Sequence, residues 1–178
     1  MTRPSLLALA LAACLGSASA AEPLPHSPGA PYAASGLADR IVLTPGADPA
    51  REMAVAFRTD NRQGASELQL APALDGPQLE KHAQSLQGSA QPLDTENGAA
   101  LYHQVRLAGL QPNTPYVYRV KGADGWSEWL QFRTAAAGFK PFRFIYLGDT
   151  QNDILSIASR SIRQALQATA SPALVVAW

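Results

Sequence analysis

The side chain best placed to hold a metal ion in this sequence is Asp149. It directly follows Gly148 and the apolar run 142–147, which is typical of a buried parallel strand. In open α/β sheets, ligands bind beyond the carboxyl ends of the strands, and glycine permits a tight turn there. Asp149 is therefore our one candidate metal ligand, although a loop or capping role fits these residues equally well. Gln151 and Asn152 come next in the chain and either line the same site or face solvent.

The three histidines lie elsewhere and do not form a metal-ligand pattern. His26 stands in a proline-rich stretch, where we expect an exposed side chain, and His82 stands in a polar segment, where we expect a solvated one. His103 shares an alternating face with Val105, which predicts a hydrogen-bonded core or interface histidine rather than a ligand. From these residues we assign no catalytic side chain and no cofactor-binding side chain.

Two tryptophans, Trp126 and Trp129, offer a second kind of chemistry. They could form an aromatic platform for a ligand, but packing at the edge of a sheet is the commoner use of such a pair, and we favour it. The single cysteine, Cys14, excludes an intramolecular disulfide framework and a thiolate metal site.

Composition and charge exclude several classes of protein. The chain has 178 residues, 47% hydrophobic and 16% charged, with 14 basic side chains against 14 acidic ones. This composition is typical of a globular protein rather than a disordered one. Without a basic excess, we expect no nucleic-acid partner and no attraction to an anionic membrane.

The N-terminus predicts export. Residues 1–20 combine one positive charge at Arg3, an uncharged apolar run and the small-x-small end Ala18-Ser19-Ala20, which is typical of a cleaved signal peptide. The run is shorter than the ~20 apolar residues that a membrane span needs. We therefore expect a periplasmic or secreted protein. A lipoprotein anchored through Cys14 is the alternative, because Leu11-Ala-Ala-Cys14 resembles a lipobox.

The elements that must position these residues fall into two groups. A proline-rich linker at 21–35 precedes short alternating strands that we assign to one β-sandwich, 36–135. Leu110-x-Pro112-x-x-x-Tyr116 resembles the tyrosine corner of immunoglobulin-like and fibronectin type III domains. We predict strands at 40–44, 53–58, 67–71, 101–107, 116–120 and 126–132, and leave the polar stretch 75–98 unassigned.

The remaining residues, 139–178, change character. The apolar strand 142–147 is followed by a helical pattern at 154–168, with Asn152 or Asp153 as its N-cap, and by a second apolar strand at 173–177. We therefore predict a mostly β chain: a fibronectin III-like sandwich, then the first β-α-β unit of an α/β sheet buried on both faces. Such a unit is too small to have a core of its own.

In order and spacing, these segments resemble purple acid phosphatases. The sandwich segments resemble the N-terminal fibronectin type III-like domain of that family, and the segment with Gly148-Asp149-Thr150-Gln151 resembles the opening of its metallophosphoesterase domain. The matching stretches are Ile41-Val-Leu-Thr-Pro45, Asp48-Pro49, Leu107-x-x-Leu110-x-Pro112-Asn-Thr114-x-Tyr116-x-Tyr118-Arg119, Trp126-Ser127-Glu128, Phe132-Arg133-Thr134 and Phe142-Arg-Phe144.

The resemblance implies a phosphomonoesterase acting on phosphate esters. In the complete family domain, a dinuclear centre of iron with iron, zinc or manganese binds the phosphate, and metal-activated water attacks phosphorus. Asp149 matches a ligand of the ferric ion.

The sequence also departs from the family. Gln151 stands where the first motif usually has glycine, and the strand at 173–176 continues as Ala177-Trp178 instead of into Gly-Asp-x-x-Tyr. The later Gly-Asn-His and Gly-His-x-His motifs are absent as well. We therefore expect the N-terminal portion of such an enzyme, truncated early in the catalytic domain and inactive alone, whether the truncation is biological or a reading-frame artefact. A non-catalytic exported fibronectin III-like binding module is the alternative.

Overall fold

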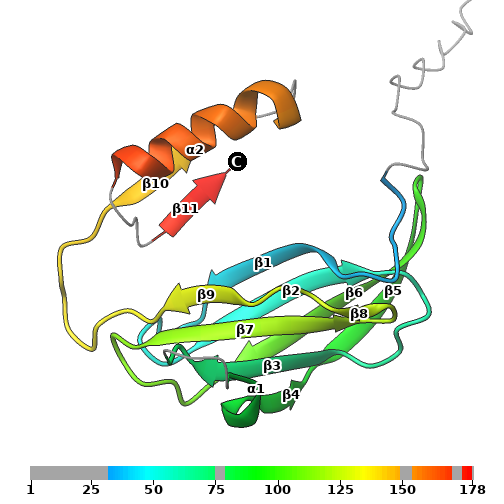
Figure 1. Cartoon of the computed structure of the whole chain (residues 1–178), viewed down its shortest axis with the longest axis horizontal. Coiled ribbons are helices and arrows are strands. Elements are labelled where there is room, and N and C mark those ends of the chain that lie inside the picture. The colour runs from blue at the N-terminus through cyan, green and yellow to red at the C-terminus, as the bar shows by residue number, and fades with distance from the viewer. Residues whose placement is uncertain (1–31, 75–78, 149–153, 170–173, 178) are drawn as a thin grey trace, which may run out of the picture.

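The computed structural model of the chain describes residues 32–74, 79–148, 154–169 and 174–177. Most of the elements are short antiparallel strands, because alternating apolar and polar residues can bury one face of a strand and solvate the other (Figure 1). The strands of this part are β1 (Asp39–Pro45), β2 (Met53–Thr59), β3 (Glu67–Pro72), β4 (Gln84–Gln87), β5 (Ser89–Thr95), β6 (Gly98–Leu107), β7 (Pro115–Gly122), β8 (Gly125–Trp126) and β9 (Leu130–Arg133), and the four-residue helix α1 is Leu79–His82.

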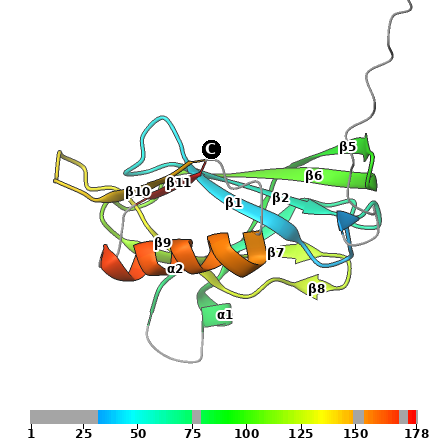
Figure 2. The same ribbon diagram turned by 90° about the horizontal axis from the view of Figure 1, so that it is seen from above.

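These strands form two sheets that pack face to face as a β-sandwich. One sheet has the order β1-β2-β6-β5, and the other has the order β4-β3-β7-β8, with β9 also paired to β7. Figure 2 shows the two layers from above. The hydrophobic core lies between them, and each fully buried aliphatic or Phe side chain contributes about 1.5–3 kcal/mol. Its members are Val55, Phe57, Leu68, Leu70, Val105, Leu107, Leu110, Tyr116, Tyr118, Val120 and Phe132.

The predicted alternation is confirmed in the central strands. Val55 and Phe57 of β2, like Val105 and Leu107 of β6, are buried, while Arg106 between the two β6 residues is exposed. The polar stretch left unassigned contributes α1, β4 and β5. Strand β5 lies at the edge of its sheet and contains a proline, which an edge strand tolerates because its outward N–H needs no partner.

The predicted strand 126–132 is wrong in one respect, because it is broken into β8 and β9. The break lies at Ser127, whose backbone N–H donates to the Val120 carbonyl at 3.0 Å. The Val120 N–H in turn donates to the Ser127 hydroxyl oxygen at 3.1 Å, so a side chain takes the place of a backbone acceptor. The residues after Ser127 therefore leave the ladder until Leu130 pairs with Tyr118.

Arg58 is a second departure from the predicted pattern. Strict alternation puts this residue on the solvent side of β2, yet it is only 3% exposed. A bulge in β1 between Asp39 and Val42, where Arg40 has φ 49°, brings Asp39 opposite Arg58. A carboxylate beside the guanidinium is what permits this burial.

The C-terminal segment forms a separate two-stranded sheet. Strand β10 (Phe144–Leu147) pairs in parallel with β11 (Leu174–Ala177), in the register Phe144↔Leu174 to Leu147↔Ala177. Between them in the sequence lie a π-helical turn (Ile154–Ala158) and helix α2 (Ser159–Ala168). The expected single helix from 154 thus starts as a wider turn, and the suggested caps Asn152 and Asp153 lie outside the described residues.

Strand β10 is buried on one face only, as expected for a unit too small to cover both faces of a sheet. Ile145 is 7% exposed, whereas Phe144 and Tyr146, which alternate with it, are 57% and 64% exposed. Helix α2 contacts β10 and can cover only one side of the strand. Among the described residues, no helix is long and apolar enough to cross a membrane.

Candidate functional site

The candidate metal ligand Asp149 lies outside the described residues, together with Gln151 and Asn152. The structure describes the strand that leads to it, β10, and Gly148, which is exposed.

Metal-ligating side chains do not gather in the part of the chain that the structure describes. No three His, Cys, Asp or Glu residues there lie close enough together to hold a metal ion. His82 is exposed at the end of α1, as expected, and His26 is outside the described ranges. A dinuclear centre needs several ligands on each metal, so these residues do not fit one.

His103 is a buried histidine with hydrogen bonds at both ring nitrogens. It is 2% exposed; its Nε2 lies 2.7 Å from the Thr59 hydroxyl and its Nδ1 lies 2.8 Å from the Ser66 hydroxyl. The ring stacks on Phe57, with centroids 4.5 Å apart and an interplanar angle of 7°. Burial lowers the pKa of His103, because the charged imidazolium is disfavoured away from water. This is the satisfied core histidine that the alternation predicted.

The two tryptophans flank a cation on the outer face of the second sheet. The Arg119 guanidinium carbon lies 4.8 Å from the ring centroid of Trp126 and 4.6 Å from that of Trp129. The ammonium of Lys121 lies 4.8 Å from the Trp126 ring. We call Lys121, Trp126, Arg119 and Trp129 the cation–aromatic ladder.

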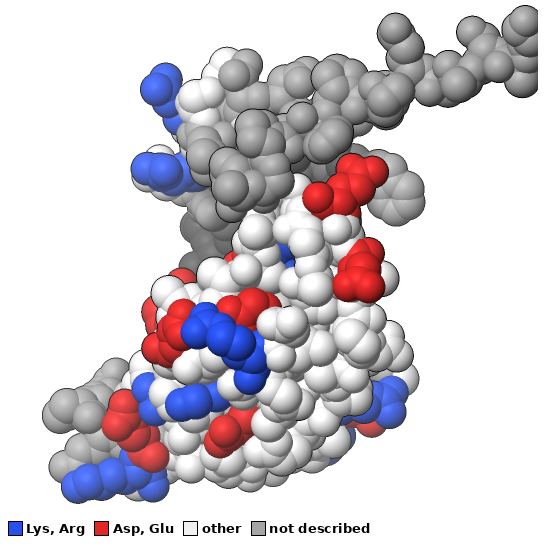
Figure 3. Space-filling model, turned by 90° about the vertical axis from the view of Figure 1, so that its right-hand side faces the viewer, with Lys and Arg blue, Asp and Glu red and all other residues white. Residues whose placement is uncertain are grey.

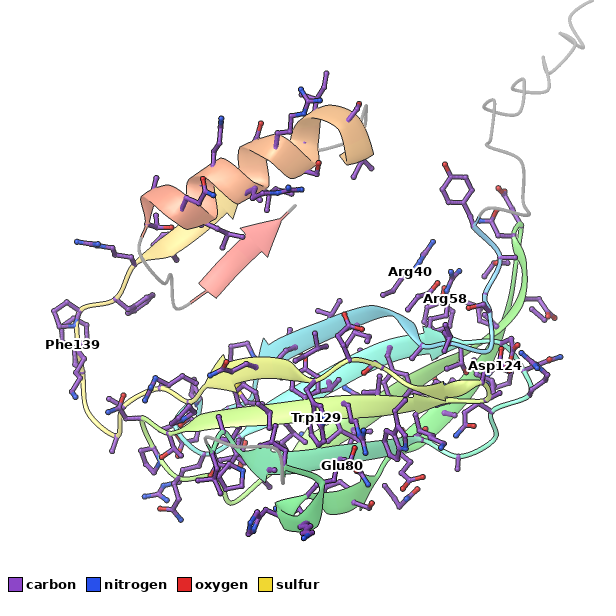
Figure 4. The ribbon with its side chains drawn as sticks, viewed as in Figure 1. Arg40, Arg58, Glu80, Asp124, Trp129 and Phe139 are labelled. Atoms are coloured by element: carbon purple, nitrogen blue, oxygen red, sulfur yellow. The ribbon has the colours of Figure 1, made fainter. Side chains whose placement is uncertain are left out.

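Arg119 is also held by hydrogen bonds to two other elements. Its Nε donates to Gln69 of β3 at 2.8 Å, and its Nη1 donates to Glu80 of α1 at 3.1 Å. Its side chain is only 14% exposed. Figure 4 shows Trp129 and Glu80 on this part of the molecule. The tryptophans thus pack against cations of their own sheet, which agrees with the packing role expected for them.

Arg119 is the residue that the sequence reasoning missed at this face. The tight turn between Gly122 and Gly125 could have revealed Arg119, because it pairs Lys121 with Trp126 across the hairpin. Residues directly opposite each other on antiparallel strands share a face. Arg119, two residues before Lys121, therefore belongs to the tryptophan face as well.

The tyrosine corner is present as predicted. The Gln111 backbone N–H donates to the Tyr116 hydroxyl oxygen at 3.0 Å, while the Tyr116 ring stacks on Phe132 at 5.6 Å between centroids. Thr134 completes the corner by donating from its hydroxyl to the Gln111 carbonyl at 2.6 Å. This bonding joins the loop before β7 to the end of β9.

Comparison with known protein families identifies the family of the sandwich domain. Residues 38–134 match the family described as "Purple acid Phosphatase, N-terminal domain". The chain belongs to this family. The matched residues run from the start of β1 to Thr134 of the tyrosine corner, so they span the sandwich of the purple acid phosphatase N-terminal domain.

Other comparisons are more remote. The search of curated proteins found no match. Among solved structures, the vertebrate-specific perforin-like membrane protein Astrotactin-2 is similar, with a TM-score of 0.39, 16% identity, and coverage of 56% of this chain and 22% of that chain. The sensor domain of the anti-sigma factor RsgI4 of Pseudobacteroides cellulosolvens is similar with a TM-score of 0.34, 14% identity, and coverage of 55% and 97%. This chain therefore spans about a fifth of the Astrotactin-2 chain, and at these TM-scores neither likeness bears on function.

Proposed function

We propose that the chain is the N-terminal portion of an exported, purple-acid-phosphatase-like phosphomonoesterase. The family match over residues 38–134 carries this proposal. Support also comes from the segment after the sandwich, because an apolar strand, β10, leads into Gly148 and Asp149. A free-standing fibronectin-like binding module has no use for such a segment, so that alternative is not favoured.

The proposed organisation has four parts. Residues 1–20 are a signal peptide and 21–35 a linker, 36–135 are the purple acid phosphatase N-terminal domain, and 139–178 are the start of a metallophosphoesterase domain. Export to the periplasm or the outside medium, with lipidation at Cys14 as the alternative, is inferred from the N-terminal sequence alone.

In this proposal, Asp149 is one ligand of a dinuclear centre that only a complete family domain assembles. The chain alone is then inactive toward phosphate esters, because one matched carboxylate cannot hold two metal ions and the described residues bring together no group of His, Cys, Asp or Glu that could hold one. Iron with iron, zinc or manganese remains the expected metal pair of the complete domain, and no reaction step is assigned to the residues of this chain.

The first experiment is to sequence the native locus beyond codon 178 and translate all three frames. We expect coding sequence for Gly-Asp-x-x-Tyr, Gly-Asn-His and Gly-His-x-His, in the same or a shifted frame. Downstream sequence without these motifs in any frame would overturn the proposal.

The second experiment measures hydrolysis of an aryl phosphate with added iron, zinc or manganese. The 178-residue chain should show no activity above the buffer blank, and the chain extended through the downstream motifs should show metal-dependent activity. Asp149→Asn should abolish the activity of the extended chain, while the matched change Asp153→Asn should leave most of it. Equal effects of the two substitutions would remove Asp149 from the metal site.

A further inference from the structure

His103 connects the two sheets of the sandwich through side-chain hydrogen bonds. The histidine belongs to β6, and Thr59, which lies at its Nε2, ends β2 of the same sheet. Ser66, which lies at its Nδ1, directly precedes β3 of the other sheet. All three side chains are at most 3% exposed, so water does not replace any of these bonds.

The direction of each hydrogen bond can be assigned by counting protons. The Thr59 hydroxyl donates its only proton to the Asp60 carbonyl at 2.9 Å, so it accepts from the ring and Nε2 carries a hydrogen. In the neutral ring, Nδ1 then has a lone pair and accepts from the Ser66 hydroxyl at 2.8 Å. In this neutral tautomer both hydroxyls and both ring nitrogens are hydrogen-bonded, and the bond from Thr59 to the Asp60 carbonyl is kept.

A second proton on the ring breaks this arrangement. Nδ1 would become a donor facing the Ser66 hydroxyl, which would have to turn its own proton away, and no other acceptor for that proton is found among the described contacts. Burying a charge without a partner is costly, so the protein would lose stability on protonation.

Among the described residues, no carboxylate is placed to offset that charge. On the neighbouring strands, Arg58 and Tyr102 alternate away from the core, and so does Glu67 beside Ser66. The Asp60 carboxylate binds the guanidinium of Arg62, at 2.7 Å.

Two other titratable groups, Asp94 and Tyr118, do not offset the charge on His103 either. Asp94 of β5 is exposed near the end of the hairpin, and the phenol of Tyr118 in the core remains neutral because burial raises its pKa to about 12. Figure 3 shows that basic and acidic side chains are interspersed on this side of the molecule, without a large patch of one sign.

We propose that His103 is an acid-sensitive latch between the two sheets. In its neutral form it holds Ser66, and with it the start of β3, against β2 and β6. When His103 is protonated, the Ser66 hydroxyl loses its acceptor and the buried charge destabilises this end of the sandwich. The latch is independent of the phosphatase assignment, because it uses only residues of the sandwich.

The lowered pKa of His103 determines how the stability of the fold depends on pH. The unfolded chain has a histidine with an ordinary pKa of 6.5, whereas the folded chain takes up the proton only at lower pH. The stabilising contribution is therefore complete above pH 6.5 and is lost as the pH falls toward the folded-state pKa. Within that window, the unfolding equilibrium constant should rise by about tenfold for each pH unit lost, because one extra proton binds the unfolded chain.

The test is urea unfolding of the full chain at a series of pH values between about 5 and 7.5, with three proteins compared. His103→Gln has a non-titrating amide, so its unfolding equilibrium constant should no longer rise as the pH falls below 6.5, whatever its absolute stability. His82→Gln, which changes an exposed histidine, should show the same rise as wild type. The same pH dependence in wild type and His103→Gln would overturn the proposal, as would its loss in His82→Gln.

A second measurement needs no loss of the histidine. In an NMR titration of the folded wild-type chain, the titration midpoint of the His103 ring protons should lie below pH 6.5, and Ser66→Ala should move this midpoint because Nδ1 loses its hydrogen-bond partner. A wild-type midpoint at or above 6.5, or an unchanged midpoint in Ser66→Ala, would contradict the latch.

Discussion

Arg58 and Asp39 form a two-pronged ion pair across the first two strands of the sandwich. Nε of Arg58 donates to Oδ1 of Asp39 at 2.8 Å, and Nη2 donates to Oδ2 at 2.6 Å. Nη1 donates to the Tyr32 carbonyl at 3.0 Å, so the same guanidinium also holds the chain that enters β1. The hydrogen bonds to Asp39 raise the pKa of Arg58, so the guanidinium is charged at every pH at which the protein folds.

Removing the charge of Asp39 should destabilise the sandwich. The Arg58 side chain is 4% exposed and that of Asp39 is 40% exposed, so Asp39→Asn leaves a nearly buried cation without its counter-charge. We expect a loss of about 1–3 kcal/mol in the free energy of unfolding, measured by urea denaturation. The control is Asp48→Asn, because Asp48 and Arg51 form an exposed pair at 4.0 Å. Its effect should stay within about 0.5 kcal/mol, and equal losses from both changes would contradict the prediction.

The cation–aromatic ladder should contribute to stability through Trp129. Trp129→Ala removes the ring that lies 4.6 Å from the Arg119 guanidinium and exposes the sheet face beneath. We expect a loss of about 1–3 kcal/mol from the lost cation–π contact and lost packing. Urea denaturation followed by circular dichroism measures it, since the substitution changes the fluorescence itself. Gln131→Ala, at an exposed position of β9, is the control and should have little effect. A Trp129→Ala protein as stable as wild type would show that the ladder does not stabilise the sandwich.

The tyrosine corner can be tested by deleting one oxygen. Tyr116→Phe keeps the ring that stacks on Phe132 but leaves the Gln111 N–H without its acceptor. The expected loss is about 0.5–1.5 kcal/mol in the free energy of unfolding, measured in urea. Tyr146→Phe removes a hydroxyl from a side chain that is 64% exposed and should change stability much less. A larger loss of stability from Tyr146→Phe than from Tyr116→Phe would contradict the stabilising role of the tyrosine corner.

Proteases should cut the chain after the sandwich before they cut within it. Phe139 is 90% exposed and Phe142 is 63% exposed in the connection to β10, where few buried contacts oppose local opening. Brief chymotrypsin digestion followed by mass spectrometry should give a fragment that ends at one of these residues. Phe139→Ser with Phe142→Ser should slow its appearance. First cleavage inside the sandwich, with residues 139–178 protected, would reverse the expected order of stability.

Local patterns were enough to predict several features of this protein. Alternation in β2, β3, β6 and β7 identified most of the core, because side chains on a strand point to opposite faces with a period of two. The tyrosine corner was also predictable, since Tyr116 and Gln111 are only five residues apart and the intervening Pro112 shapes the loop. His103 was recognised as a core residue by the same alternation, although its partners were not.

The tertiary structure alone decided which distant side chains meet. Arg58 and Asp39 are 19 residues apart, and Arg119 and Glu80 are 39 apart. Their contacts depend on the order of strands in each sheet, and no local period encodes that order. Ser66 reaches His103 only because the two sheets pack face to face. Alternation placed Arg58 on the outer face of β2, but its burial there depends on the bulge in β1 that brings Asp39 opposite it, which no local period in β2 encodes.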